Sequence, residues 1–399
     1  MTRIADRRRF LYGSGVVLTA GLAGCLTDEG SDEQDHDDGI SDDTEDGPEA
    51  VGSDGLVYAF APDRICILDP ADGELVDEIT DEFDDESWAD PQITSDFERI
   101  FIVEESLDQV HVINTETRTH ETAIDVGPGV NHIYHPVDDE IWVHADTEGA
   151  FYVIDIDALE VSEIVESGLE EEGHGKLLYH EEMGDIGYAT NVNDPGIPVI
   201  DLGAYERTEF IEFGEVGGTH YKAYSPENGL AYVEYISETV VVDPTTEDIV
   251  DEFDFTGGMF LSPEGDRLAI VDGEVYLVDV SDQESDVLGS LAIDGSPSTV
   301  RFGPTGETAF VANADSDEIA IIDVEELEEI GRLDAGEITG RNRMAVSGGD
   351  YFITPADADD SVAIVDMTTQ TVDLVDVGTS VEAIQYVGDS GVGYSGKLR

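Results

Sequence analysis

The sequence has few basic residues and almost no lysine. Among its 399 residues, 17 are Lys or Arg and 94 are Asp or Glu, which gives a formal net charge of -77. The lysines are Lys176, Lys222 and Lys397. This scarcity argues against nucleic acid as a partner, because binding a polyanion requires a basic surface. The acidic excess is typical of a protein that works in molar salt, where the Debye length is roughly 3 Å and repulsion between surface charges is screened.

Cysteine is also scarce, and the two cysteines cannot form a disulfide framework. Cys25 lies in an N-terminal leader, whereas Cys66 falls in the apolar register of a strand and is expected to be a small buried hydrophobe. A long hydrophobic run is lacking too, since the apolar stretch at residues 16–23 is too short to span a bilayer. We therefore expect no disulfide in this chain.

What the sequence does contain is a repeat. Apolar residues make up 40 % of the chain and follow strand periodicity, so a core can form despite the charge. A short apolar run that closes on an acidic or amide residue recurs at intervals of 36 to 46 residues. The closing residues are Asp69, Asn114, Asp155, Asp201, Asp243, Asp279, Asp323 and Asp366. A period in this range, with four short strands per unit, predicts an all-β fold, a β-propeller.

The eight runs predict eight blades, and seven blades remain the alternative if the run ending at Asn114 is misread. Residues 56–80 supply three strands of one blade, and the stretch from 381 to 395 supplies its innermost strand. Strands from both termini would thus close one blade, which removes the free sheet edges. The repeat at 311–336, VANADSDEIAIIDVEELEEIGRLDAG, resembles the YVTN-type and cytochrome d1-type propeller repeats. The resemblance covers residues 55–399 and implies the fold, but propellers host many unrelated functions.

The N-terminal region carries targeting signals. Arg7 and Arg8 precede an apolar stretch, and the segment Leu22 to Cys25 has the form of a lipobox. Residues 1–24 resemble a twin-arginine lipoprotein signal, and the composition resembles that of haloarchaeal exported proteins. This implies cleavage before Cys25, a lipid on its thiol, and an extracytoplasmic protein anchored to the outer face of the cytoplasmic membrane; an uncleaved leader acting as the anchor would give the same topology. Residues 25–54 are acidic with almost no apolar content and should form a disordered tether.

Three histidines occupy matching places in consecutive repeats. His132, His174 and His220 lie in or just before three successive innermost strands, each after a glycine-rich lead-in. Three imidazoles that converge and leave a fourth position open would suit Zn²⁺ or Cu²⁺. The alternative is that each histidine is a hydrogen-bonded structural residue at a strand end.

Basic residues concentrate in the innermost strands and their lead-ins, namely at Lys176, Lys222, Arg301, Arg341 and Arg343. In so acidic a chain they could form a positive funnel for a carboxylate, an oxyanion or a porphyrin propionate; the alternative is that they pair with local acids. Together with the histidines they would also fit a d1-like haem pocket. Covalent c-type haem is excluded because the sequence has no C-x-x-C-H motif.

The propeller, the export signal and the histidines together resemble periplasmic propeller metallochaperones. The resemblance implies a zinc-binding lipoprotein that hands its metal to the solute-binding protein of an ABC importer. Two other functions remain open: a d1-type haem or redox protein, and a surface recognition module without a cofactor. No nucleophile and base can be paired from the sequence, so we expect a non-enzymatic protein, and a monomer that meets the membrane only through its lipid.

Overall fold

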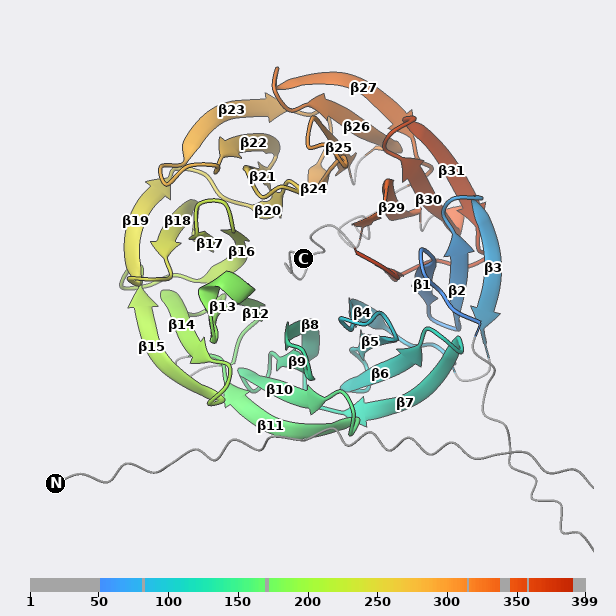
Figure 1. The fold of residues 1–399 in the computed structure, drawn as a ribbon, viewed down its shortest axis with the longest axis horizontal. Coiled ribbons are helices and arrows are strands. Elements are labelled where there is room, and N and C mark those ends of the chain that lie inside the picture. The colour runs from blue at the N-terminus through green and yellow to red at the C-terminus, as the bar shows by residue number, and fades with distance from the viewer. Residues whose placement is uncertain are drawn as a thin grey trace, which may run out of the picture. The chain divides into compact units, whose positions relative to one another are not determined.

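The computed structural model describes residues 51–80, 83–168, 172–313, 316–337, 345–356 and 359–389. Within these residues, eight four-stranded antiparallel sheets follow one another in a ring (Figure 1). The all-β, eight-bladed fold expected from the repeat is therefore confirmed. The residues expected to form the signal peptide, most of those expected to form the acidic tether, and Cys25 lie outside the described residues. None of the described helices is long and apolar enough to cross a membrane.

Each blade runs from an innermost strand near the axis of the ring to an outermost strand at its rim. Blades 1 to 4 consist of β4 (Trp88–Ile93), β5 (Arg99–Glu104), β6 (Gln109–Asn114) and β7 (Thr119–Asp125); β8 (Val130–Val137), β9 (Glu140–Ala145), β10 (Ala150–Asp155) and β11 (Glu160–Glu166); β12 (Gly175–Leu178), β13 (Ile186–Asn191), β14 (Gly196–Asp201) and β15 (Glu206–Glu212); and β16 (Thr219–Ser225), β17 (Leu230–Tyr235), β18 (Glu238–Asp243) and β19 (Asp248–Phe253).

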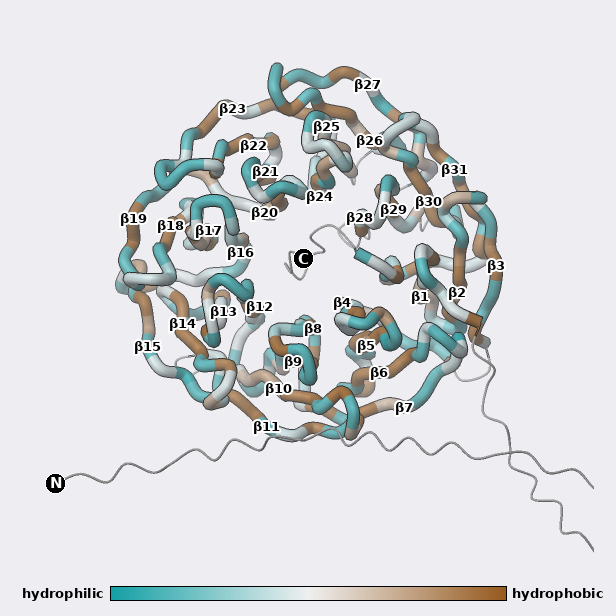
Figure 2. The backbone as a smooth tube through the Cα atoms, viewed as in Figure 1, coloured by the Kyte–Doolittle hydropathy of each residue, from teal (hydrophilic) through white to brown (hydrophobic). Residues whose placement is uncertain are grey.

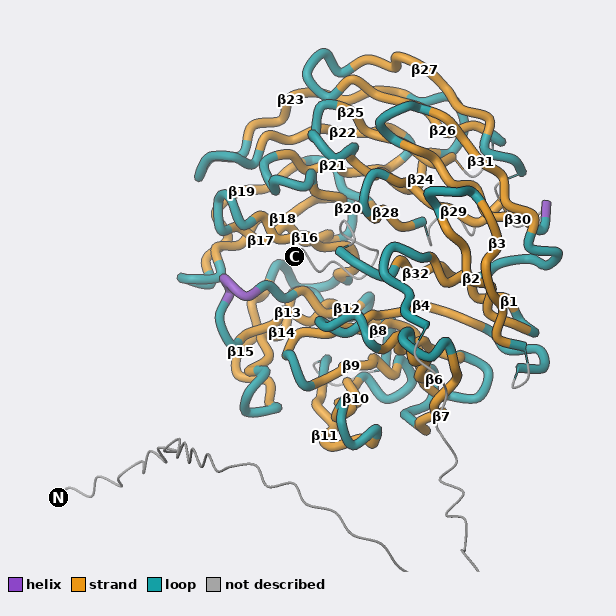
Figure 3. Tube along the Cα trace, turned by 45° about the vertical axis from the view of Figure 1, so that its right-hand side comes forward, coloured by secondary structure: helices purple, strands orange, loops and turns teal. Residues whose placement is uncertain are grey.

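Blades 5 to 7 consist of β20 (Gly258–Leu261), β21 (Arg267–Asp272), β22 (Glu274–Asp279) and β23 (Asp286–Ala292); β24 (Pro297–Phe302), β25 (Thr308–Asn313), β26 (Glu318–Asp323) and β27 (Glu328–Asp334); and β28 (Val346–Gly348), β29 (Tyr351–Ala356), β30 (Ser361–Asp366) and β31 (Thr371–Asp376). A short 3-10 helix, η1 (Glu181–Met183), precedes β13. Figure 3 shows how completely strands dominate the ring.

Blade 8 joins the two ends of the propeller. Its innermost strand is β32 (Ala383–Tyr386), and its other strands are β1 (Val57–Ala61), β2 (Arg64–Asp69) and β3 (Glu74–Ile79). β1 pairs with β32 so that Val57 faces Tyr386 and Phe60 faces Ala383. The predicted closure by strands from both termini is thus confirmed. The part of the expected inner stretch beyond residue 389 lies outside the described residues.

The core lies between neighbouring blades, because each sheet packs on both of its faces. In β26, the four residues Ile319 to Ile322 are at most 2 % exposed, and outermost strands such as β3 are largely exposed. Figure 2 shows hydrophobic stretches of strand separated by hydrophilic turns around the ring. Cys66 is fully buried between blades 7 and 8 and forms no disulfide, as expected. Burial raises the pKa of its thiol to about 12, so it behaves as a hydrophobe.

The residue that closes each apolar run forms the turn between the third and fourth strands. In blade 6, the Asp323 carboxylate accepts hydrogen bonds from the backbone N–H groups of Glu325 and Glu326, at 3.0 and 2.9 Å. The side-chain oxygen of Asn114 accepts from Thr117 N–H in the same way, at 2.9 Å. An asparagine can replace the aspartate because the turn needs only the side-chain acceptor. Asn114 is therefore a regular member of the repeat, which supports eight blades over seven.

Four positions after that residue the backbone has a positive φ in seven of the eight repeats. These residues are Gly73, Arg118, Leu159, Tyr205, Glu247, Leu327 and Gln370. A non-glycine residue is uncommon in this conformation. The side-chain acceptor at the start of the turn helps to hold the chain in it.

We expect Asp323→Ala to lower the free energy of unfolding by about 1–2 kcal/mol, because it removes the acceptor of two backbone hydrogen bonds. Asp323→Asn should restore most of the loss. Denaturant titration in molar salt measures both. Glu325→Ala is the matched control, since it removes an exposed carboxylate from the same turn; an equal loss in that variant would contradict the role given to Asp323.

Candidate metal centre

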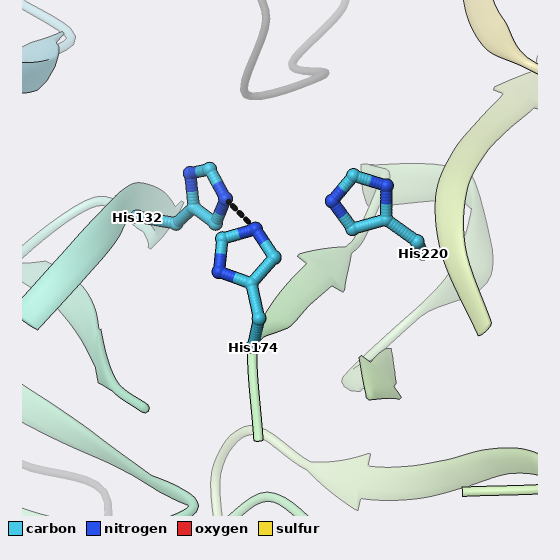
Figure 4. A group of neighbouring side chains, drawn as sticks. All are labelled: His132, His174 and His220. Atoms are coloured by element: carbon cyan, nitrogen blue, oxygen red, sulfur yellow. Dashed lines mark hydrogen bonds between the residues drawn. The ribbon is translucent and has the colours of Figure 1, made fainter. Parts of the chain in front are cut away.

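The three predicted histidines come together at the inner edge of blades 2, 3 and 4. His132 lies in β8, His174 directly precedes β12, and His220 lies in β16. Their ligand atoms all lie within 4.8 Å of one another, and Figure 4 shows the three rings gathered from neighbouring strands. The ring centroids of His132 and His174 are 4.6 Å apart, and those of His174 and His220 are 5.1 Å apart.

The strand pairing is irregular beside two of the three histidines. The register of β8 with β9 shifts between Val130 and Ile133, which brackets His132. The register of β16 with β17 shifts between Thr219 and Lys222, which brackets His220. Such irregularities redirect side chains at the edge of a sheet and are common beside functional sites.

A carboxylate holds the Nδ1 atom of each histidine. Asp90 of β4 lies 2.6 Å from His132 Nδ1, and Asp146, after β9, lies 2.8 Å from His174 Nδ1. Glu234 of β17 lies 3.5 Å from His220 Nδ1. Partners of this kind orient a metal-binding imidazole and fix the tautomer, leaving the other nitrogen for the metal. All three Nε2 atoms are therefore the candidate ligands.

Asp146 also orders a fourth histidine behind the cluster. Its Oδ1 atom lies 2.7 Å from His144 Nδ1, and its Oδ2 atom contacts His174. His144 is fully buried, and its Nε2 atom lies 2.8 Å from Ser167 Oγ. Burial alone would raise the pKa of Asp146, but the hydrogen bonds with His144 and His174 outweigh it and hold this pKa well below its usual range. Asp146 is therefore ionised and accepts on both oxygens.

The cluster favours neutral imidazoles. Burial lowers the pKa of His132 well below its usual range, and the positive charge of Lys176 acts in the same direction. Burial likewise lowers the pKa of His220 to about 4, against the opposing hydrogen bond with Glu234. Neutral imidazole is the form that binds metal, so the lone pairs of these two rings are available at neutral pH.

His132 and His174 lie close enough to share a proton between their rings. Their Nε2 atoms lie 3.0 Å apart, within hydrogen-bond distance. Each Nδ1–H already donates to a carboxylate, so a hydrogen bond between the two Nε2 atoms requires one additional proton. A metal that binds both nitrogens must displace this proton.

Two of the five predicted basic residues lie beside the cluster. Lys176 of β12 is 2 % exposed, and its Nζ lies 4.9 Å from the centroid of the Tyr221 ring. Lys222 of β16 is 6 % exposed, and its Nζ lies 5.5 Å from the centroid of the Tyr134 ring in β8. Burial lowers the pKa of Lys222 to about 8, against the charge of Asp90, so this lysine remains largely protonated at neutral pH.

The other predicted basic residues do not join them. Arg301 lies in blade 6, where it donates to the backbone carbonyls of Val300 and Ala345 at 2.9 and 2.5 Å and packs on Phe260. Burial lowers its pKa to about 9. Arg341 and Arg343 lie outside the described residues. Within the described part of the chain, the expected funnel is therefore a pair of lysines beside the histidines and a separate arginine in another blade.

Two further histidines at the opposite ends of the inner strands have structural partners. His135 Nδ1 lies 2.8 Å from the carbonyl of Glu140, and its Nε2 accepts from Ser95 N–H at 3.2 Å. His180 caps η1 by accepting from Glu182 N–H at 3.2 Å. These hydrogen bonds give both histidines a structural role, which is common for a histidine at a strand end.

The sequence matches no protein-family model and no curated protein sequence. Its fold is similar to several solved structures. Dihydro-heme d1 dehydrogenase NirN, solved in complex with DHE, has a TM-score of 0.68 at 13 % identity over 84 % of this chain and 75 % of NirN. Apo AztD from Citrobacter koseri has a TM-score of 0.61 at 13 % identity over 85 % of this chain and 98 % of AztD. The computationally designed protein Ika8 has a TM-score of 0.60 at 13 % identity over 82 % of this chain and 95 % of that chain.

At this level of identity the likeness concerns the fold, and the presence of a designed protein among the neighbours shows how little the fold specifies function. Fold and site together define an eight-bladed β-propeller with a three-histidine cluster at its inner edge.

We expect Asp90→Asn and Asp146→Asn each to weaken metal binding by roughly 10- to 100-fold, because an amide orients an imidazole less firmly than a carboxylate does. Competition with a chromophoric chelator measures the affinity. Asp139→Asn is the matched control, since Asp139 is exposed on the turn between β8 and β9. Unchanged affinity in both site variants would contradict the role of the carboxylates.

Proposed function

We propose that this protein carries one transition-metal ion, with zinc as the first candidate, on the Nε2 atoms of His132, His174 and His220. The observation that carries the proposal is the convergence of the three side chains within 4.8 Å, with a carboxylate at each opposite nitrogen. Three imidazoles with a fourth position left open form a ligand set that zinc accepts in tetrahedral geometry. Copper(II) generally binds such ligands more tightly than zinc. The availability of each metal, as well as its affinity, would therefore decide which ion is bound.

Binding requires a small contraction of the cluster. Zinc lies roughly 2.0–2.1 Å from histidine nitrogens, which places tetrahedral ligands about 3.3 Å apart. His132 and His174 are already at 3.0 Å, so the wider gap is on the side of His220. The contact of His220 with Glu234, at 3.5 Å, is also the longest of the three carboxylate contacts. His220 is therefore the ligand that would move.

A d1-type haem site is the competing proposal, and the similarity in fold to NirN supports it. A haem iron takes axial ligands from the protein on the two opposite faces of the tetrapyrrole, so three imidazoles gathered at one point exceed its needs. Of the basic residues expected to bind haem carboxylates, Lys176 and Lys222 contact aromatic rings, Arg301 donates to a backbone carbonyl in another blade, and Arg341 and Arg343 lie outside the described residues. The geometry favours a metal ion over a tetrapyrrole.

We further propose that the metal is cargo and is handed to the solute-binding protein of an ABC importer. The support is the sequence of the leader, which resembles a twin-arginine lipoprotein signal, and the open fourth position of the site. A lipid on Cys25 would keep the propeller on the outer face of the cytoplasmic membrane, where such an acceptor works. In this proposal the protein is a monomeric, non-enzymatic metallochaperone.

Elemental analysis and an absorption spectrum test the proposal directly. Protein purified in high salt without an affinity tag should carry or take up about one zinc or copper per chain and show no Soret band. His174→Ala combined with His220→Ala should remove the metal, and circular dichroism should remain that of a folded propeller, since neither ring is fully buried.

His180→Ala serves as the control, because it removes a histidine that caps η1 away from the cluster. Stoichiometric metal retained in the double variant would refute the site. A Soret band with iron would support the haem alternative, and a colourless protein that takes up no added zinc would leave a recognition module.

Metal binding at pH 7 should release no more than one proton per ion. Burial keeps the pKa values of His132 and His220 low, so the proton that a metal could have to displace is one held between the Nε2 atoms of His132 and His174. Affinity should therefore fall as pH falls, because protons compete with the metal for the same nitrogens. Calorimetry in buffers of different ionisation enthalpy counts the protons, and a release of two or more would contradict this description of the cluster.

A further inference from the structure

His174 is the least buried of the three candidate ligands. Its side chain is 31 % exposed, compared with 4 % for His132 and 20 % for His220. It also directly precedes a strand, whereas the other two lie within strands. A partly exposed side chain can change its rotamer unless a hydrogen bond holds it. The orientation of His174 therefore depends strongly on Asp146, which lies 2.8 Å from its Nδ1 atom.

The carboxylate of Asp146 is itself partly exposed, so it must be held in place before it can orient another side chain. Asp146 directly follows β9, and its side chain is 23 % exposed. Its Oδ2 atom contacts His174, and its Oδ1 atom lies 2.7 Å from His144 Nδ1. A carboxylate that accepts on both oxygens cannot rotate without losing a hydrogen bond. His144 thus fixes the direction in which Asp146 presents Oδ2 to His174.

His144 is suited to this role because its own ring is held by packing and by both of its nitrogens. The ring is fully buried in β9, and its centroid lies 4.9 Å from that of Phe151 in β10. Its Nε2 atom lies 2.8 Å from Ser167 Oγ. Asp146 is ionised and can only accept, so His144 Nδ1 is the donor whether the ring is neutral or charged.

The backbone around His174 also contacts this pair of residues. The Asp146 carbonyl accepts from Gly173 N–H at 2.9 Å. On the other side of His174, a Cβ atom at Gly175 would come within 2.8 Å of His144 Cε1 and Nε2. An ordinary contact between carbon atoms is roughly 3.5–4.0 Å, so the ring of His144 packs closely against position 175 because glycine is there.

Ser167, His144 and Asp146 contact one another in the order of a Ser–His–Asp triad. Catalysis by the serine is not supported, because Ser167 is 1 % exposed and its hydroxyl is closed to a substrate. The series of hydrogen bonds continues from the second oxygen of Asp146 to His174. Its end point is therefore a candidate metal ligand.

We propose that His144 is a positioning residue, which fixes the orientation and the tautomer of His174 through the carboxylate of Asp146. His144 does not ligate the metal, since its nitrogens face Asp146 and Ser167. The inference rests on the proposed function in one respect: the purpose of the fixed orientation is to present His174 Nε2 to a metal ion.

Substitutions of His144 test the effect on metal binding. His144→Leu removes both nitrogens and keeps an apolar side chain in the buried position, and it should weaken zinc binding roughly tenfold. His144→Asn keeps an N–H near the place of Nδ1 and should recover most of the affinity. Competition with a chromophoric chelator measures the affinity, and denaturant titration of the metal-free protein measures the stability of each variant. If the leucine variant does not fold, His144→Gln replaces it, since its amide lies near the place of Nε2.

His135→Leu is the matched control. His135 is also fully buried in blade 2 and is hydrogen-bonded at both ring nitrogens, but at the opposite end of β8. Its loss should lower stability and leave the zinc affinity unchanged. A loss of affinity equal to that of His144→Leu would overturn the inference, because the effect would then follow from stability alone.

A double-mutant cycle tests the route through Asp146. Asp146→Ala removes the link between His144 and His174, so adding His144→Leu to it should cost no further zinc affinity, although stability should fall again. Residues that act through one another are non-additive in this way. Fully additive losses of affinity would overturn the inference.

The tautomer of His174 is a second readout, and it requires no metal. Long-range ¹⁵N–¹H spectra of the histidine-labelled, metal-free protein in mildly alkaline buffer distinguish a proton on Nδ1 from one on Nε2, and His174→Gln assigns the signal. The wild-type protein should hold the proton on Nδ1, and His144→Leu should give a mixture of the two tautomers. A signal that does not respond to His144→Leu would overturn the inference, whether or not a metal binds. If the signal responds but the protein binds neither zinc nor copper, the proposed function fails and the positioning role of His144 stands.

Discussion

The pairing of β32 with β1 is the constraint on which the rest of the structure depends, because it turns a row of repeats into a closed ring. The effect of this closure extends to the histidine cluster. Trp88 at the start of β4 donates its backbone N–H to Glu382, beside β32, at 2.9 Å, and its indole N–H to Ala61 of β1 at 2.8 Å. β4 then carries Asp90, which holds His132. The orientation of His132 is thus connected to the joining of the chain ends.

The fold could be predicted from the sequence because each repeat has a side-chain hydrogen-bond acceptor at the same turn. The residue that ends each apolar run is a hydrogen-bond acceptor for the turn that follows, and Asn114 serves as well as the aspartates do. Such a requirement is local, so it is visible at regular intervals in the chain. The three histidines could be proposed for a similar reason, since nine histidines are few and three of them recur at matching places.

The carboxylates of the site could not be selected from the sequence. Asp90, Asp146 and Glu234 are three among 94 acidic residues, and nothing local separates them from the residues that solvate the surface. The shifts of register beside His132 and His220 could not be predicted from the sequence either, because a strand pattern assumes that side chains alternate without interruption. Long-range pairing decides both features. Long-range pairing also places Arg301 in blade 6, away from the two lysines, which the sequence did not predict.

The histidine cluster belongs to the ring and to no single repeat. Its histidines come from blades 2, 3 and 4, and their carboxylate partners come from blades 1, 2 and 4. An isolated four-stranded unit would hold at most one imidazole of the three. Identical copies of one such unit could build the scaffold, but they would not build this cluster, which depends on differences between the blades. The half of the ring formed by blades 5 to 8 contributes none of these six residues, so a substitution there would reach the cluster chiefly through the closure of the ring.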